Sequence, residues 1–197
     1  MPRLDLEPAA CAMTVLLDGV SDEQLLAATP CPKYSLGDLI DHVDGLSLAF
    51  VAAARKEKLP GDARGPNGDA RRLGSEWRSR IPARLAELAE AWADPAAWEG
   101  TTEAGGREMP GELAGTIALD ELVVHGWDVA RATGQNFDCP HELIEACIGF
   151  VSVSADPAER AEDNGLFGPV VHVPANASPL EHLVGLAGRD PAWNGTR

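Results

Sequence analysis

The sequence is poor in the features that mark secreted and membrane-spanning proteins. It has only four cysteines in 197 residues and no Cys-x-x-Cys pair, so it predicts neither a disulfide framework nor a thiolate zinc site. No apolar run approaches the roughly 20 residues that cross a bilayer, and the first residues lack the basic start and apolar stretch of a signal peptide. We therefore expect a cytoplasmic protein with no membrane partner.

Positive charge is also scarce. Lysine and arginine number 16 against 31 aspartates and glutamates, and no basic run is longer than the pair Arg71-Arg72. Because phosphate binding needs clustered cations, we expect no nucleic-acid partner. The hydrophobic content of 45% over this length is enough to bury a sizeable core, so the sequence predicts one compact unit.

Apolar residues recur at helical spacing in several segments. Helices are predicted over about 6–20, from 36 to before Pro60, over 73–92, over 110–132, from near Pro140 to Val151, and over 179–187. Ser35 and Ser178 each open a Ser-x-x-acid capping signal, and Gly134 is the expected C-terminal cap of the fourth helix. Pro82 lies inside the third helix and is expected to kink it.

The connections between these segments suggest the architecture. The run 98–108 is polar and glycine-rich and fits either a loop or a short hairpin, and residues 170–173 fit one isolated strand. The connection 60–69 is long enough for the helices that it joins to run parallel. We predict an all-α fold, a four-helix bundle with a long crossover between its second and third helices. With a fifth helix, the bundle is expected over 1–155, and a small C-terminal helical extension packed on it over 156–197.

The fourth predicted helix carries ionisable residues among small ones. Glu121 and His125 are one turn apart, so they project from the same side with Cβ atoms about 6 Å apart. His42 lies in an apolar row of the second helix, between Leu39 and Leu46. Two histidines and a glutamate form a zinc-type donor set that leaves coordination positions open. Residues on a solvated helix face and hydrogen-bonded core histidines give the same pattern. The spacing alone therefore does not decide between a metal site and residues of this ordinary kind.

Four further residues have two interpretations each. Asp128, on the same helix, is expected either to orient a metal-binding histidine or to pair with an arginine. We expect Asp38 to serve the capping box of the second helix rather than to orient His42. Trp127 is interpreted as a packing residue. Cys31 is interpreted as a small buried hydrophobe rather than a nucleophile.

A resemblance to a known family is carried by these same residues. Thr29-Pro30-Cys31, Leu39-Ile40-Asp41-His42 and Asp120-Glu121-Leu122-Val123-Val124-His125-Gly126-Trp127-Asp128-Val129-Ala130 resemble the actinobacterial metal-binding proteins grouped with mycothiol-dependent maleylpyruvate isomerase. This group belongs to the DinB/YfiT-like bundle superfamily. Phe167-Gly168-Pro169 and Gly188-Arg189-Asp190-Pro191-Ala192-Trp193 resemble the end of the same subgroup. The resemblance therefore covers nearly the whole chain.

The resemblance implies that His42, Glu121 and His125 bind a divalent metal, either zinc or nickel. Members with known activity bind the sulfur of a low-molecular-weight thiol such as mycothiol at the open metal position. A thiol-dependent transferase or isomerase is therefore expected, with a small-molecule thiol and an electrophilic substrate as its partners. The chain departs from the isomerase after Asp156 and has no basic cluster there for a dicarboxylate, so maleylpyruvate is not the expected substrate.

Two other functions stay open at this point. One is a non-catalytic helical module that the metal stabilises. The other is metal-assisted hydrolysis, which is disfavoured because the His-Glu-x-x-His arrangement with its built-in general base is absent. The identity of the metal, the electrophile and the formation of a homodimer do not follow from these residues.

Overall fold

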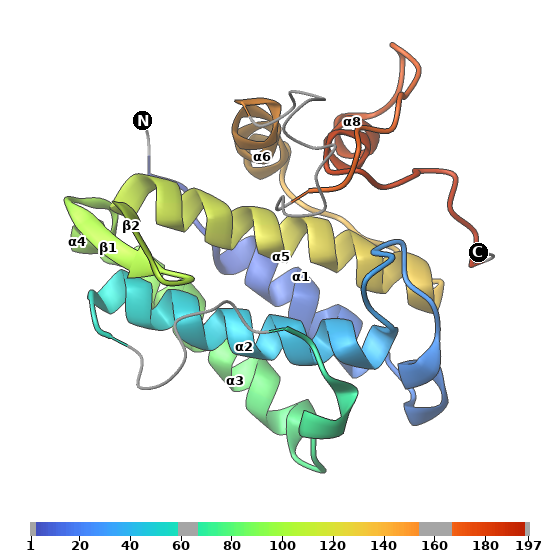
Figure 1. Ribbon diagram of the computed structural model, residues 1–197, viewed down its shortest axis with the longest axis horizontal. Helices are drawn as coiled ribbons and strands as arrows, with labels where there is room; N and C mark the ends of the chain where they lie inside the picture. The colour runs from blue at the N-terminus through green and yellow to red at the C-terminus, as the bar shows by residue number, and fades with distance from the viewer. Residues whose placement is uncertain (1–2, 59–66, 154–166, 196–197) are drawn as a thin grey trace.

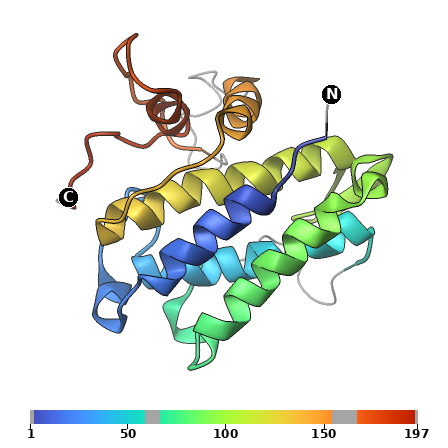
Figure 2. The ribbon, with the colours of Figure 1, turned by 180° about the vertical axis from the view of Figure 1, so that it is seen from behind.

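The computed structural model describes residues 3–58, 67–153 and 167–195, and most of these are helical. Four long helices lie side by side: α1 (Glu7–Asp18), α2 (Leu36–Arg55), α3 (Trp77–Ala93) and α5 (Gly111–Thr133). Both α1 and α2 contact both α3 and α5, as Figures 1 and 2 show from opposite sides. The predicted helices are confirmed, except that the third begins at Trp77 rather than Leu73 and the fourth at Gly111 rather than Pro110.

Local capping signals explain where these helices begin and end. The Ser35 hydroxyl accepts from the backbone N–H of Asp38, and the Asp38 carboxylate accepts from that of Ser35. Asp38 therefore serves the capping box, as expected. Helix α5 ends at Gly134, whose φ of 74° is a left-handed conformation that glycine adopts without strain. Helix α3 continues through Pro82.

One close approach in the core requires glycine. Trp92 on α3 is buried, donates its indole N–H to the carbonyl oxygen of Phe50 at 3.1 Å and packs edge-on against Trp98. Trp98 ends the short helix α4 (Pro95–Trp98). A Cβ at Gly115 of α5 would lie 2.7 Å from the Trp98 ring and 2.8 Å from the Trp92 ring. Glycine at this position therefore lets α5 pack directly on both indoles.

The connections contain elements that periodicity did not predict. Short 3₁₀ helices form at η1 (Asp22–Leu26) and η2 (Ala70–Arg72). Strands β1 (Thr101–Ala104) and β2 (Arg107–Pro110) form an antiparallel hairpin, which decides the open choice over 98–108. Gly105 and Gly106 join the strands with φ of 58° and 74°, the left-handed pair that a tight hairpin turn needs.

The C-terminal part packs on one side of α5. Helix α6 (His141–Val153) contacts both α5 and α8 (Pro179–Leu186), and Figure 1 shows α6 and α8 together above α5. Residues 170–173, which fit one isolated strand by composition, do not form a strand. Among the described residues no strand lies beside this segment, and the backbone N–H of Val171 bonds instead to the carbonyl oxygen of Gly185.

The predicted division near residue 155 lies outside the described residues, as does most of the 60–69 crossover. Across the described segments, no helix combines the length and the apolar composition that crossing a membrane requires.

Candidate metal centre

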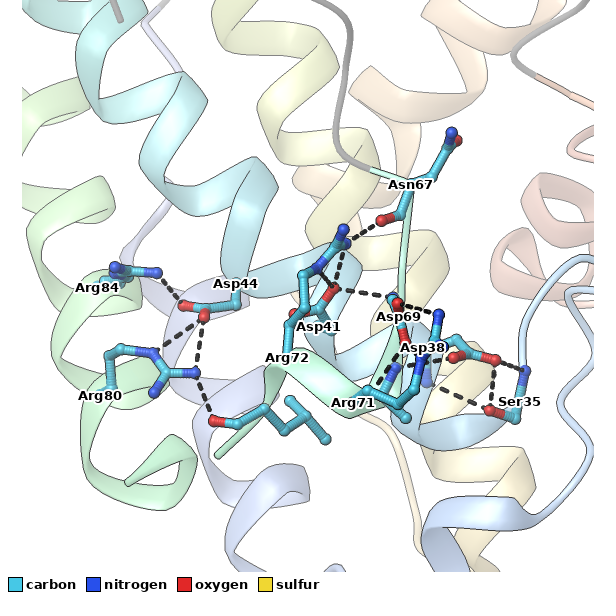
Figure 3. A network of polar contacts seen from close by, with 12 residues as sticks. Ser35, Asp38, Asp41, Asp44, Asn67, Asp69, Arg71, Arg72, Arg80 and Arg84 are labelled. Carbon is cyan, nitrogen blue, oxygen red and sulfur yellow. Dashed lines mark hydrogen bonds and ion pairs between the residues drawn. The ribbon is translucent and has the colours of Figure 1, made fainter. Parts of the chain in front are cut away.

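Three aspartates on one face of α2 fix how this helix is turned. Asp38, Asp41 and Asp44 are three residues apart, so they point the same way (Figure 3). Their partners come from the end of the crossover and from α3. Asp38 accepts from the backbone N–H of Ala70, and Asp41 accepts from the backbone N–H of Asp69 and pairs with Arg72. Asp44 pairs with Arg80 and Arg84. Because Asp41 and Asp44 are almost fully buried, these contacts hold α2 in one rotation.

With α2 held in this rotation, His42 faces helix α5 and meets Glu121 and His125. Glu121 Oε2 lies 3.0 Å from His125 Nε2 and 3.8 Å from His42 Nε2. One ligand atom from each of the three residues lies within 4.8 Å of the other two. The two imidazole rings meet edge to face, with centroids 5.2 Å apart. The structure thus brings all three sequence-predicted residues to one place, from two different helices.

The separations suit a small divalent cation. Ligand atoms about 2.0–2.1 Å from a zinc ion at tetrahedral angles lie about 3.3 Å from one another. The two distances measured from Glu121 Oε2, 3.0 and 3.8 Å, fall on either side of that value. Two imidazoles and one carboxylate are donors that zinc and nickel accept, and three donors leave a coordination position open. The residues present therefore fit the metal that the sequence pattern suggests.

Behind the cluster lies a second layer of charged groups. His125 Nδ1 lies 3.0 Å from Asp128 Oδ2, and Arg189 Nη2 lies 3.0 Å from the same oxygen. Arg189 Nε also reaches Asp128 Oδ1, at 3.4 Å. The Asp128 side chain is 0% exposed and that of Arg189 8%. Asp128 therefore contacts His125 and also pairs with an arginine, so both contacts that the sequence suggested are present.

These contacts shift the pKa values of the buried groups. Burial lowers the pKa of His125, but hydrogen bonds to Asp128 and Glu121 outweigh it and raise that pKa to about 10. Burial raises the pKa of Asp128, but the Arg189 charge and the His125 hydrogen bond bring it below its usual value. Glu121 follows the same pattern: the hydrogen bond from His125 and nearby positive charges overcome burial and lower its pKa.

Comparison with known proteins decides the family. The sequence profile described as "Mycothiol maleylpyruvate isomerase N-terminal domain" matches residues 6–130. The chain belongs to this family. His42, Glu121, His125 and Asp128 all lie inside the matched region, whereas Arg189 lies outside it.

Two relatives and one solved structure are similar to most of the chain. Uncharacterized proteins from the CDC 1551 / Oshkosh and H37Rv strains of Mycobacterium tuberculosis are each 27% identical over 188 residues, which is 95% of this chain and 97% of theirs. The crystal structure of the mycothiol-dependent maleylpyruvate isomerase matches with a TM-score of 0.50 and 16% identity, covering 74% of this chain and 66% of that one. At this identity the likeness shows the fold alone, and the chain spans just under two thirds of the solved protein.

Two residues at the centre were not singled out from the sequence. Tyr34 precedes α2, and its ring lies 5.0 Å from that of His42. Arg189 stands in the quoted C-terminal motif, but no periodicity connects it with Asp128, which is 61 positions earlier. Among the described residues, the arginine that pairs with Asp128 is Arg189 and not Arg131, the arginine nearest to it in the sequence. Instead, Arg131 donates to the carbonyl oxygen of Trp193 and lies against the Trp127 ring.

Trp127 and Cys31 match their sequence interpretations. Trp127 is buried, as expected of a packing residue. Cys31 is buried too, as expected of a small hydrophobe. His141 is exposed and pairs with Glu145 on its own helix.

The apolar side of the centre is closed. A cavity of about 10 Å³ lies beside Glu121 between α2, α3 and α5, and it is lined by Val43, Leu46, Ser47, Phe50, Leu88, Ala118 and Leu122. This volume holds about one water molecule. A thiol therefore does not fit on the core side of Glu121.

Proposed function

We propose that this protein binds one divalent metal ion, zinc or nickel, through His42, Glu121 and His125. We further propose that it uses the ion as a thiol-dependent transferase or isomerase, with mycothiol as the thiol. The observation that carries the proposal is the convergence of two imidazole nitrogens and one carboxylate oxygen within 4.8 Å. Such a donor set from facing helices is how helical bundles build metal sites.

The family supports the choice of thiol. The matched profile and the solved isomerase are both named for mycothiol, and the profile covers every proposed ligand. The way in which α1, α2, α3 and α5 contact one another supports the finer fold proposal, a DinB-like four-helix bundle. The chain resembles only part of the solved isomerase, so the electrophilic substrate is left open.

When bound, a divalent ion would lower the pKa of a coordinated thiol and keep it as a thiolate at neutral pH. The protein's own residues prepare the site for this. Because Asp128 accepts from Nδ1 of His125, the proton of the neutral ring is held on that nitrogen and the Nε2 lone pair faces Glu121 and His42. Glu121 supplies one negative charge, and the Tyr34 ring covers one side of His42.

Elemental analysis tests the metal proposal directly. We expect one zinc or nickel per chain in the purified protein and a loss of that metal in His125→Ala. His141→Ala is the matched control, because His141 is an exposed helical histidine far from the cluster in sequence and paired with Glu145. Metal-free wild-type protein, or unchanged metal in His125→Ala, would refute the site.

Calorimetry and turnover test the thiol. Metal-loaded protein is expected to bind mycothiol and to form adducts with at least one member of a panel of electrophiles, and His125→Ala is expected to do neither. If metal-loaded protein binds no mycothiol and forms no adduct, the enzymatic proposal fails although the metal site stands.

One observation favours a non-catalytic alternative. The donors come from two helices, His42 on α2 and both others on α5, so an ion would also hold these helices together. A purely structural ion predicts a large fall in melting temperature on chelation and no binding of any thiol. Binding of mycothiol to the metal-loaded protein would exclude this alternative.

A further inference from the structure

The C-terminal segment brings a buried positive charge to the candidate metal centre. Arg189 contacts both carboxylate oxygens of Asp128 and donates from Nη1 to the carbonyl oxygen of Ala187 at 2.8 Å. Its charge also acts on Glu121, since it is among the groups that lower the pKa of that carboxyl. The field of Arg189 therefore reaches the donor cluster, and little water is present to screen it.

The end of α8 is built to deliver this side chain. The backbone N–H of Gly188 bonds to Gly185 O at 3.1 Å and that of Arg189 to Val184 O at 2.8 Å, the pattern of a glycine-terminated helix. Gly188 has a φ of 84°, and a Cβ there would lie 2.8 Å from the Cα of Gly168. Only glycine fits this turn, which aims the next residue back at α5.

Counting the charges shows what Arg189 adds. Glu121 and Asp128 carry two negative charges, which together would cancel those of a divalent ion. Neutral His42 and His125 change nothing in this sum. With Arg189 included, the centre keeps one net positive charge when the ion is bound. An anionic ligand is attracted to such a centre, whereas a neutral one gains nothing from the extra charge.

We propose that Arg189 sets the ligand preference of this centre, making the open metal position selective for an anionic ligand such as a thiolate. This inference rests on the proposed function, because it assumes that the ion binds. Arg189 acts here through its charge, because its guanidinium is bound by Asp128, which is not one of the three proposed ligands. The C-terminal segment thus completes a site whose ligands all lie within the family-matched region.

Two small probes separate charge from structure. Thiocyanate is a monovalent anion and imidazole, above its own pKa, is neutral, and both bind at an open metal position. Binding to full-length protein loaded with Co²⁺ is followed by the visible absorption of the metal. We expect Arg189→Met to weaken thiocyanate binding roughly fivefold to tenfold, the effect of one unit charge in a water-poor site, and to leave imidazole binding unchanged.

Further variants test the charge count. The double variant Asp128→Asn with Arg189→Met removes one charge of each sign, so thiocyanate binding is expected to return to the wild-type value. Asp128→Asn alone adds net positive charge and is expected to strengthen it, which decides the matter if Arg189→Met fails to fold. Arg55→Met is the control, because it also removes one arginine charge and one ion pair, that to Glu87, outside the centre.

The outcomes distinguish this inference from the proposed function. A wild-type protein that binds no Co²⁺ refutes both. If wild-type protein binds Co²⁺ but Arg189→Met weakens both probes equally, or neither, then Arg189 has a structural role only and the inference is overturned. The same holds if the double variant binds thiocyanate as weakly as Arg189→Met does.

Discussion

Metal binding at this centre should depend steeply on pH, because the ion and a proton compete for the same nitrogen. In the metal-free protein His125 has a pKa of about 10, held there by Asp128 and Glu121 against the effect of burial. Its Nε2 must lose the proton before it can donate to a metal. Since the proton leaves on binding, affinity rises with pH as long as the pH is below about 10.

The size of the effect follows from the same pKa. Each pH unit is worth about 1.36 kcal/mol, so the apparent affinity for zinc is expected to rise about tenfold per unit near neutral pH. Between pH 7 and the pKa of about 10 this amounts to about 4 kcal/mol of binding free energy spent on releasing the proton.

The metal-free protein should respond in the opposite sense. The folded-state pKa of His125 lies above its unfolded value of 6.5, so its ion pairs stabilise the fold fully below that value. This stability is lost as the pH rises through about 10. Zinc should therefore stabilise the protein most over the same window in which the metal-free form weakens.

A competition titration against a chromophoric chelator, run from about pH 6.5 to about 8.5, measures the rise of zinc affinity with pH after correction for the chelator's own protons. Thermal unfolding of metal-free protein over the same pH range measures its loss of stability as the pH rises. His141→Ala, an exposed histidine, should leave the zinc slope unchanged. A wild-type affinity that does not vary with pH would refute the assignment of His125 as a protonated ligand.

Three further predictions concern the ligand from α2, the core and the cap of α8. His42→Ala removes the donor that α2 contributes, so zinc affinity should fall at least tenfold in the same titration. Gly115→Ala places a Cβ 2.7 Å from the Trp98 ring and should cost about 1–3 kcal/mol in chemical denaturation. Gly149→Ala, with nothing within 4 Å, should instead gain about 0.5–1 kcal/mol. Ser178→Ala removes the hydroxyl that accepts from the backbone N–H of Glu181 and should cost about 1 kcal/mol locally, seen as faster amide exchange in α8.

Each of these has a clear contrary result. Unchanged zinc affinity in His42→Ala would mean that α2 contributes no ligand. Equal stabilities of the two glycine variants would contradict the close packing of α5 on the indoles. Unaltered exchange in Ser178→Ala would show that packing on α6, rather than the cap, holds α8.

Local features explain why most helices were predictable. A helix is stabilised by neighbours three and four residues away, so periodicity and the capping boxes at Ser35 and Ser178 report it directly. The sequence does not distinguish a loop from a hairpin over 98–108, because the two strands are short. The hairpin is defined only by the pairing of Thr101 with Pro110 and of the residues between them. Residues 170–173 fit a strand by composition but form none, since an extended segment becomes a strand only beside a partner.

The candidate site divides in the same way. Glu121 and His125 share a helix face by their spacing alone, and His42 was a candidate because it lies in an apolar row of the second helix. The resemblance to a known family favoured these three residues as one metal site. Whether an imidazole on α2 meets that face depends on how α2 is turned, and this is decided by Asp41 and Asp44 and by the arginines that bind them.

By itself, then, the sequence determined the helical elements, their caps and the identity of the candidate donors, because these depend on residues close together in the chain. Tertiary structure alone decided that the donors converge and that Arg189 stands behind them. The reason is that Arg189 meets Asp128 across 61 positions, through a turn at Gly188 and the packing of α8 on α6, which in turn contacts α5. No local sequence pattern encodes such a contact, since it depends on how all the elements between the two residues pack on one another.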